Sequence, residues 1–287
     1  MSESPRVALA TCSAMPHGDE DDVALPGLLG AEFAIWDDPA VDWDGYDLVV
    51  VRSTWDYQDR RDEFVAWARR VGGRLVNPPD VIAWNTDKRY LSELEAAGLP
   101  VVHTQLVAPG GPFADPGGEY VVKPTVSAGS RHTARFTDGE HHRAEALVRD
   151  IHATDRTAMV QPYVASVDER GETALLFFDG VFSHAIRKGP ILRPGEDPVA
   201  DVLFAEEEIR PRDPSADELA VAQRVVGWVA ERFGGPLAYA RVDVVEDASG
   251  APLVLELELA EPSLFFAHAE DSAARYAAAV RARHVRD

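Results

Sequence analysis

The segment PLVLELEL, residues 252–259, restricts the possible folds more than any other part of the chain. Side chains alternate between the two faces of a β-strand, so Glu256 and Glu258 point the same way, about 7 Å apart. The side chains expected together on the opposite face are Leu253, Leu255, Leu257 and Leu259. Such a strand must have its leucine face against a core, while its two carboxylates face either solvent or a charged site.

A second strand precedes this one and completes a hairpin over residues 238–259, with its turn at 248–251. If the two arms pair symmetrically about the turn, Asp243 faces Glu256 and Arg241 faces Glu258, all on one face of the sheet. Like charges opposed across strands destabilise a sheet, and one arginine neutralises only part of this patch. A hard divalent cation such as Mg²⁺ would supply the remaining charge. A solvent-facing acidic hairpin is the alternative, and the hairpin alone does not decide between them.

The chain contains only three lysines, which makes the position of each informative. They are Lys88, Lys123 and Lys188. Lys123 ends the apolar strand EYVVKP and is followed by a small glycine-containing loop, TVSAGSRH, whose backbone N–H groups can bind phosphate with help from Lys123 and Arg131. An ordinary exposed turn is the simpler interpretation of this loop taken alone. Neither GxxxxGK[ST] nor GxGxxG occurs, which disfavours a P-loop or a Rossmann dinucleotide site.

Composition excludes several classes of protein. Hydrophobic residues make up 46% of the 287, enough for a substantial core. The formal net charge of −21 opposes nucleic-acid binding, which needs clustered Lys and Arg. One cysteine, Cys12, allows neither an internal disulfide nor a cysteine-based zinc site. No apolar run approaches about 18 residues and no signal-like segment starts the chain, so we expect a cytoplasmic protein that does not contact membranes.

The N-terminal region has the pattern of an α/β unit. The strands RVALAT (6–11) and LVVV (48–51) are apolar throughout, and a helix is predicted over 61–73, which favours a parallel sheet covered on both faces. Ligands bind beyond the carboxyl ends of such strands. Arg52 is there a candidate for a substrate carboxylate. The candidates for a substrate amine or hydroxyl are Ser53, Thr54, Asp56 and Tyr57.

Downstream, one helix is predicted over 85–98, and residues 101–210 read mostly as strands with one helix near 139–152. The helix that begins at Ser215 has a capping box with Glu218. A last helix is expected over 271–284.

Taken in order, the motifs Lys88, EYVVKPTVSAGS, MVQPYV, GETALLFF…SHAIRK, RVDVV and LELELAEPS resemble the ATP-grasp superfamily. The similarity is to the prokaryotic glutathione synthetase and D-alanine–D-alanine ligase type, and especially to D-cycloserine synthetases. This resemblance implies an α/β chain with α+β elements, in which a Rossmann-like pre-ATP-grasp domain (1–82) precedes the ATP-grasp fold. The small subdomain with its linking helix would span 83–165 and the C-terminal catalytic subdomain 166–287. Several such relatives are dimers or tetramers, so a homo-oligomer is compatible with the sequence.

The resemblance also implies a nucleotide site. Phosphate contacts would come from Lys88, Lys123 and the loop residues Ser127, Gly129 and Ser130. The adenine would lie against Gln161, Tyr163 and Val164. Glu172 would accept from the ribose hydroxyls, with Asp168 as the alternative.

The remaining implied roles concern metal and substrate. Asp243, Glu256 and Glu258 would hold two Mg²⁺ ions, which Mn²⁺ can replace. Arg241 would hold the reacting carboxylate, and Arg187 and Lys188 the transferring phosphoryl oxygens. Ser263 is a further substrate candidate, although a helix cap is the simpler account of it. One departure is Glu258, where relatives usually have Asn.

The activity implied is ligation that depends on ATP and Mg²⁺. A small amino-acid-like substrate would be activated at its carboxylate as an acylphosphate and attacked by an amine. Ring closure within one molecule, as in the biosynthesis of the antibiotic D-cycloserine, is one form of this reaction. A ligase that modifies a peptide, and a nucleotide-binding protein without turnover, are the alternatives.

Overall fold

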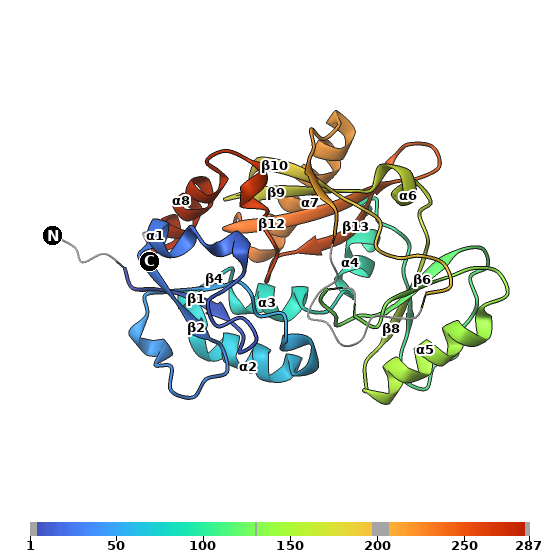
Figure 1. The fold of residues 1–287 in the computed structure, drawn as a ribbon, viewed down its shortest axis with the longest axis horizontal. Coiled ribbons are helices and arrows are strands. Elements are labelled where there is room, and N and C mark those ends of the chain that lie inside the picture. Colours follow the sequence, from blue (N-terminus) through green and yellow to red (C-terminus); the bar gives the residue numbers. More distant parts are fainter. Residues whose placement is uncertain (1–4, 130, 197–206, 285–287) are drawn as a thin grey trace.

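A computed structural model describes residues 5–129, 131–196 and 207–284 (Figure 1). Its N-terminal part is a parallel four-stranded sheet in the order β2-β1-β3-β4. The strands are β1 (Val7–Thr11), β2 (Ala31–Ile35), β3 (Leu48–Val51) and β4 (Leu75–Val76). Every residue of β1 and β3 is buried, which confirms the prediction from their unbroken apolar runs.

Helices cover both faces of this sheet. On one face α2 (Arg61–Val71) packs through Phe64 and Trp67. On the other lie α1 (Leu25–Leu29) and, from the far end of the chain, α8 (Ser272–His284), whose Tyr276 is fully buried. The C-terminal helix α8 is therefore packed on the N-terminal unit, beside α1 in Figure 1.

The larger of the two remaining sheets is antiparallel, in the order β11-β10-β9-β12-β13. Its strands are β9 (Glu172–Phe178), β10 (Val181–Lys188), β11 (Ile209–Pro211), β12 (Tyr239–Glu246) and β13 (Pro252–Glu258). The helix α7 (Ala216–Phe233) covers one face through its apolar stripe. Ser215 and Glu218 form the predicted capping box at its start, and Gly234 ends it in a left-handed conformation.

The smaller sheet, also antiparallel, has the order β5-β8-β6-β7 and is packed against α5 (His141–Ala153). Its strands are β5 (Gln105–Val107), β6 (Tyr120–Pro124), β7 (Ala134–Phe136) and β8 (Ala158–Pro162). A short helix that the sequence did not predict, α6 (Ser166–Arg170), connects β8 to β9. The single-turn 3-10 helices are η1 (Glu20–Asp22), η2 (Trp43–Gly45), η3 (Tyr57–Asp59), η4 (Gly72–Arg74) and η5 (Phe266–His268).

The helix predicted over 85–98 is confirmed in part, because α4 (Tyr90–Ala96) lies within that range but begins later than predicted. A helix that the sequence did not predict, α3 (Pro79–Asn85), precedes it, and Lys88 lies in the break between the two. A proline in the first turn starts α3, because proline is well suited to that position. In the break, the backbone N–H of Lys88 donates to the carbonyl of Thr125 at 2.8 Å. The break thus joins Lys88 to the loop that follows β6.

The predicted pairing of β12 with β13 is confirmed near the charged residues. Asp243 pairs with Glu256 and Arg241 with Glu258. Nearer the turn the register shifts by one residue, so that Val244 pairs with Val254. This β-bulge changes which side chains share a face.

The single leucine face expected for β13 is therefore wrong. Leu257 packs in the core beneath α7, but Leu253 and Leu255 lie against Tyr163 and Val164 in a separate cluster. The bulge turns the first half of the strand towards the smaller sheet. Apolar side chains of β13 consequently reach the same cavity as its carboxylates.

Candidate active site

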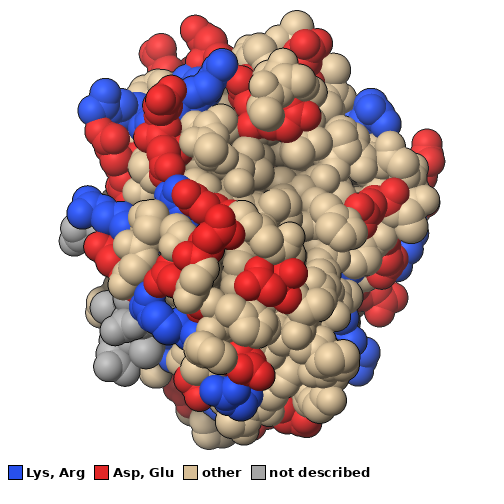
Figure 2. All heavy atoms as spheres, turned by 90° about the vertical axis from the view of Figure 1, so that its right-hand side faces the viewer, with Lys and Arg blue, Asp and Glu red and all other residues tan. Residues whose placement is uncertain are grey.

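A cleft of about 750 Å³ is lined by residues from the two antiparallel sheets and from loops that include those of the N-terminal unit. The charged side chains that line it on the hairpin and the lysine-bearing segments are Lys88, Lys123, Glu172, Lys188, Arg241, Glu256, Glu258 and Glu261. All three lysines of the chain are thus gathered in one cavity. The face shown in Figure 2, by contrast, carries many acidic side chains with basic ones scattered among them.

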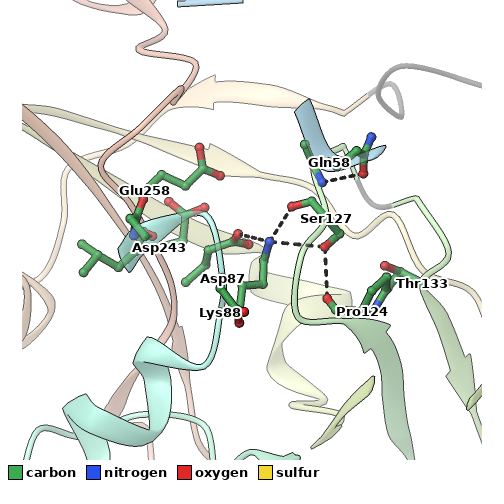
Figure 3. A network of polar contacts seen from close by, with 12 residues as sticks. Gln58, Asp87, Lys88, Pro124, Ser127, Thr133, Asp243 and Glu258 are labelled. Atoms are coloured by element: carbon green, nitrogen blue, oxygen red, sulfur yellow. Dashed lines mark hydrogen bonds and ion pairs between the residues drawn. The ribbon is translucent and has the colours of Figure 1, made fainter. Parts of the chain in front are cut away.

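Lys88 connects Glu256 on β13 to the small loop after β6. Its ammonium lies 3.2 Å from a carboxylate oxygen of Glu256 and donates to the carbonyl of Ser127 at 2.6 Å (Figure 3). The hydroxyl of Ser127 lies 3.3 Å from the same ammonium and donates to the Pro124 carbonyl. The backbone N–H of Ala128 is bound by Gln58 from the N-terminal unit at 3.0 Å. The loop is therefore held at its start from two sides.

Lys188 and Arg241 surround Asp243. The ammonium of Lys188 lies 3.3 Å from Asp243 and 3.4 Å from Glu172. The guanidinium of Arg241 binds Asp243 through two bonds of 2.8 and 3.0 Å and also pairs with Glu258. Asp243 has no exposed surface and does not line the cleft, so its negative charge is neutralised by Lys188 and Arg241.

The two carboxylates on β13 differ in their ionisation. Burial disfavours the charge on Glu256, but Lys88, Lys123 and Lys188 outweigh it and lower the pKa of Glu256 to about 2. Burial also disfavours the charge on Glu258. Although Arg241 counteracts this, burial together with the neighbouring negative charges raises the pKa of Glu258 to about 8. At neutral pH the negative charge of the pair is on Glu256.

Lys123 presents its ammonium to the cleft. In the described ranges it makes no hydrogen bond or ion pair with protein groups, although Glu256 acts on it electrostatically. Burial, the largest influence, lowers its pKa, and the attraction of Glu256 opposes this. A buried cation without its own partner is arranged to receive an anionic ligand.

The proposed adenine residues Gln161, Tyr163 and Val164 all line the cleft. The amide of Gln161 donates to Thr104 at 2.9 Å, so its side chain is held within the protein. The guanidinium of Arg135 lies 3.4 Å from the ring centroid of Tyr163, which restricts that ring.

The two ribose candidates are placed differently. Glu172 lines the cleft. Asp168 does not, because it binds Arg135 at 3.0 Å and accepts from the Tyr163 hydroxyl at 2.6 Å. Of the two, only Glu172 is positioned to meet a ligand.

Only some of the residues predicted to contact the phosphates line the cleft. Ser127 and Gly129 line the cleft, while Ser130 lies outside the described residues. Arg187 does not line the cleft, since its guanidinium donates to the carbonyl of Arg170 at 2.8 Å on the far side of β10. Alternation along β10 explains this, because Arg187 and Lys188 point to opposite faces.

Two of the six substrate candidates line the cleft, Tyr57 and Ser263. Arg52 does not, because it forms a buried ion pair with Asp22 at 2.7 Å. The remaining three, which also lie outside the lining, are Ser53, bonded to Asp22; Asp56, bonded to Trp36 and Arg60; and Thr54, which is fully buried.

Comparison with known proteins identifies the family. Residues 7–77 match the family described as the N-terminal domain of D-cycloserine synthetase DcsG. The chain is 41% identical over 268 residues to the cycloserine biosynthesis protein DcsG of Streptomyces lavendulae, and the alignment covers 88% of each chain. The chain belongs to the DcsG family of ATP-grasp ligases.

Solved structures agree with this assignment. The crystal structure of D-cycloserine synthetase DcsG matches with a TM-score of 0.86 and 37% identity, over 97% of this chain and 99% of that one. The D-alanine–D-alanine ligase of Bacillus anthracis in complex with ATP matches with a TM-score of 0.65 at 13% identity, over 98% of each chain, which shows the shared fold. The predicted ATP-grasp fold and the prediction of an ATP-dependent carboxylate–amine ligase are confirmed.

Two carboxylates of this ATP-grasp ligase are available to a metal ion in the cleft, Glu256 and Glu258. Within the described residues, no three His, Cys, Asp or Glu side chains are arranged to hold a metal ion by themselves. The side chains of Glu256 and Glu258 keep 22% and 25% of their surface exposed, and both line the cleft. Mg²⁺ needs only one or two protein carboxylates when water and phosphates complete its shell, so this pair fits it.

Several residues of this DcsG-family site have no obvious signal in the sequence. Glu261 lines the cleft, and its carboxylate is hydrogen-bonded to the Tyr57 hydroxyl. Asp21, Asn77 and Asn85 bind the backbone that carries the site. The sequence offered only indirect hints, such as the asparagine before two prolines at 77–79 and the acidic run at 19–22.

In the part of the chain that the structure describes, no helix is long and apolar enough to cross a membrane.

Proposed function

We propose that the cleft binds Mg²⁺–ATP and activates the carboxylate of a small amino-acid-like substrate for attack by an amine. The observation that carries this proposal is the convergence of Lys88, Lys123 and Lys188 on one cavity with Arg241 and Glu256. A protein of net charge −21 has gathered all its lysines around a single anion site. Such a concentration of buried cations fits a polyphosphate.

The reaction would proceed in two balanced steps. A substrate carboxylate oxygen attacks the γ-phosphorus, an O–P bond forms, the bridging P–O bond to the β-phosphate breaks, and ADP leaves. The amine nitrogen then attacks the carbonyl carbon, a C–N bond forms, the C–O bond to phosphate breaks, and the amine loses a proton. Lys88, Lys123 and Lys188 would neutralise the phosphate oxygens, and Arg241 would orient the substrate carboxylate.

Mg²⁺, when bound, would neutralise charge on the phosphates. We assign Glu256 and Glu258 to it. Asp243 is the third metal candidate from the sequence, but it is enclosed by Arg241 and Lys188 and would keep these cations in place.

Glu261 would accept the proton that the amine loses. Burial raises the pKa of Glu261 to about 7, against the opposing hydrogen bond from Tyr57, and a general base works best when its pKa is near the operating pH. Its carboxylate lines the same cleft as Arg241 and Ser263. These residues would form the end of the cleft that takes the amino acid.

We further propose that the amine and the carboxylate belong to one molecule, so that the product is a ring. This rests on the 41% identity to a cycloserine biosynthesis protein, which extends over most of both chains. Ligation of two separate molecules uses the same chemistry and is the outcome to be distinguished.

The test is phosphate release from ATP and Mg²⁺ against single amino acids, pairs of amino acids and amines, and short peptides, with O-ureidoserine among the single compounds. Stimulation by one compound with a cyclic product, lighter than the substrate by at least one water, supports ring closure. Stimulation only by a pair would refute ring closure but support ligation. Stimulation only by peptides, or none at all despite ATP binding, would overturn the small-molecule assignment.

A further inference from the structure

The backbone from Leu257 to Phe266 is held by side chains instead of by a neighbouring strand. β13 is the edge of its sheet, so the outer N–H and C=O groups at its end have no strand to pair with. Six residues from the first third of the chain supply these partners, and we name them the backbone clamp. They are Asp21, Arg52, Trp55, Asn77, Asn85 and Tyr90.

The clamp follows the backbone almost residue by residue. Asn85 accepts from the N–H of Leu259 at 2.6 Å, and Asn77 donates to its carbonyl at 2.8 Å. Trp55 then donates to the carbonyl of Glu261 at 3.0 Å. Because these partners lie more than 170 residues away in sequence, the clamp fastens the catalytic hairpin to the N-terminal unit.

Asp21 makes the densest set of contacts in the clamp. One of its carboxylate oxygens accepts from the N–H groups of Leu264 and Phe265 at 2.9 and 2.7 Å, and the other accepts from Phe266 at 2.6 Å. Phe265 has a positive φ of 53°, a strained conformation for a bulky side chain. Three N–H groups converging on one carboxylate supply the stabilisation that such a conformation needs.

Arg52 holds Pro262, which lies just before the segment bound by Asp21. Its guanidinium binds Asp22 through two bonds of 2.7 and 2.8 Å and donates to the carbonyl of Pro262 at 3.0 Å. Only 2% of the Arg52 side chain is exposed, so it cannot reach a ligand in the cleft. This buried fork connects the acidic loop at 19–22 to the turn after β13.

The segment held in this way forms one wall of the substrate end. Ser263 and Phe265 line the cleft, the guanidinium of Arg241 donates to the carbonyl of Ser263 at 3.2 Å, and the Phe265 ring centroid lies 5.6 Å from Arg241. The nucleotide-side residues Lys123 and Tyr163 make no contact with the clamp that the structure records.

We propose that Asp21 and Arg52 are positioning residues for the amino-acid substrate: they hold residues 262–266 so that Arg241 and Ser263 are in place before the substrate binds. This deepens the proposed function and rests on it. It assigns Arg52 an indirect role in place of direct binding of a substrate carboxylate. A preformed wall lowers the ordering cost of binding and brings the reacting carboxylate near its productive position.

The first experiment requires no substrate. Hydrogen exchange followed by mass spectrometry is measured on the peptide that covers residues 262–268 in wild-type protein, in Asp21→Asn and in the control Asp62→Asn, whose side chain is fully exposed on α2. The amide of Asn cannot replace both carboxylate oxygens as acceptors. We expect exchange to accelerate at least tenfold in Asp21→Asn and not in the control. Unchanged protection would overturn the clamp itself.

The second experiment measures steady-state kinetics with the stimulating substrate found in the phosphate-release assay, together with the Kd for Mg²⁺–ATP. Arg52→Lys is included because it keeps the buried charge beside Asp22 but loses the fork. We expect both variants to raise the KM for the amino-acid substrate at least tenfold while the Kd for Mg²⁺–ATP changes less than twofold. Equal losses for both ligands would show a merely structural role and overturn positioning.

These outcomes remain separable from a failure of the proposed function. If no small molecule stimulates turnover, the proposed substrate class fails, while the exchange result still decides whether the clamp holds the wall. If turnover is found and the exchange protection is lost without any change in KM, the ligase assignment stands and the positioning role is refuted.

Discussion

Glu256 and Glu258 differ in ionisation, so we expect their substitution to lower activity to different extents. The pKa of Glu256 is about 2, because Lys88, Lys123 and Lys188 outweigh its burial, while burial raises the pKa of Glu258 to about 8. At pH 7 Glu256 is therefore charged, whereas Glu258 is held mainly in its protonated form. Glu256→Gln removes a whole charge, and Glu258→Gln removes little.

The structure also indicates how much activity each variant should lose. Glu256 would act through the Mg²⁺ it helps to hold, and loss of one preorganised electrostatic group in a water-poor site lowers kcat about 100- to 1,000-fold, so we expect Glu256→Gln to fall in this range. Glu258→Gln keeps an oxygen that can accept from Arg241 and bind Mg²⁺, so its loss should stay within about tenfold.

Phosphate release at several Mg²⁺ concentrations measures both losses, and binding of Mn²⁺ in the presence of ATP, followed by electron paramagnetic resonance, measures the metal site directly. Glu246→Gln is a suitable control, since Glu246 lies on the same hairpin but pairs with Arg170 outside the cleft. The reasoning is refuted if Glu258→Gln loses as much activity as Glu256→Gln, or if Glu256→Gln turns over normally.

Three further predictions test other parts of the molecule. Lys123→Ala should raise the KM for ATP at least severalfold, because its ammonium faces the cleft without a hydrogen bond or ion pair to any described residue; an unchanged KM would remove it from the nucleotide site. Asn77→Ala should lower the free energy of unfolding, measured with urea, by about 3 kcal/mol, since it breaks three buried hydrogen bonds; a loss below 1 kcal/mol would contradict this. Burial lowers the pKa of His184, so the unfolded chain takes up its proton first as the pH falls below about 6.5. Stability between pH 7 and 5 should therefore fall more steeply in the wild-type protein than in His184→Gln, and equal slopes would exclude the effect.

The sequence predicted best what depends on local periodicity. Alternation along the two hairpin strands was enough to bring Arg241, Asp243, Glu256 and Glu258 to one face, because a symmetrical turn and a period of two leave few choices of register. The bulge beyond Asp243 was not predictable in the same way. The bulge puts Val254 in the core with Leu257 and moves Leu253 and Leu255 to a separate cluster, and leucines at every second position carry no sign of such a shift.

Side chains that act over long sequence separations were the hardest to predict. The carboxyl ends of parallel strands did place Arg52 near the correct edge of the sheet. Arg52 nevertheless turns away from the cleft because it pairs with Asp22, and Asp22 lies in an acidic loop without a periodic pattern. The contacts of Asp21 span more than 240 residues, and nothing local in its sequence distinguishes it from a solvated acidic residue.

The strong negative charge of the chain and its affinity for an anionic nucleotide are compatible because they act over different distances. Repulsion from dispersed surface carboxylates is screened beyond about 8 Å at physiological salt. The three lysines are shielded from solvent and lie in one cavity, where salt weakens their attraction much less. When no nucleotide is bound, two of the three lysines are already paired within the protein, Lys188 with Asp243 and Lys88 with Glu256, which makes them less available to solvent anions. A phosphate group must then compete with carboxylates that are fixed in position, which favours a ligand with several phosphates over a single small anion.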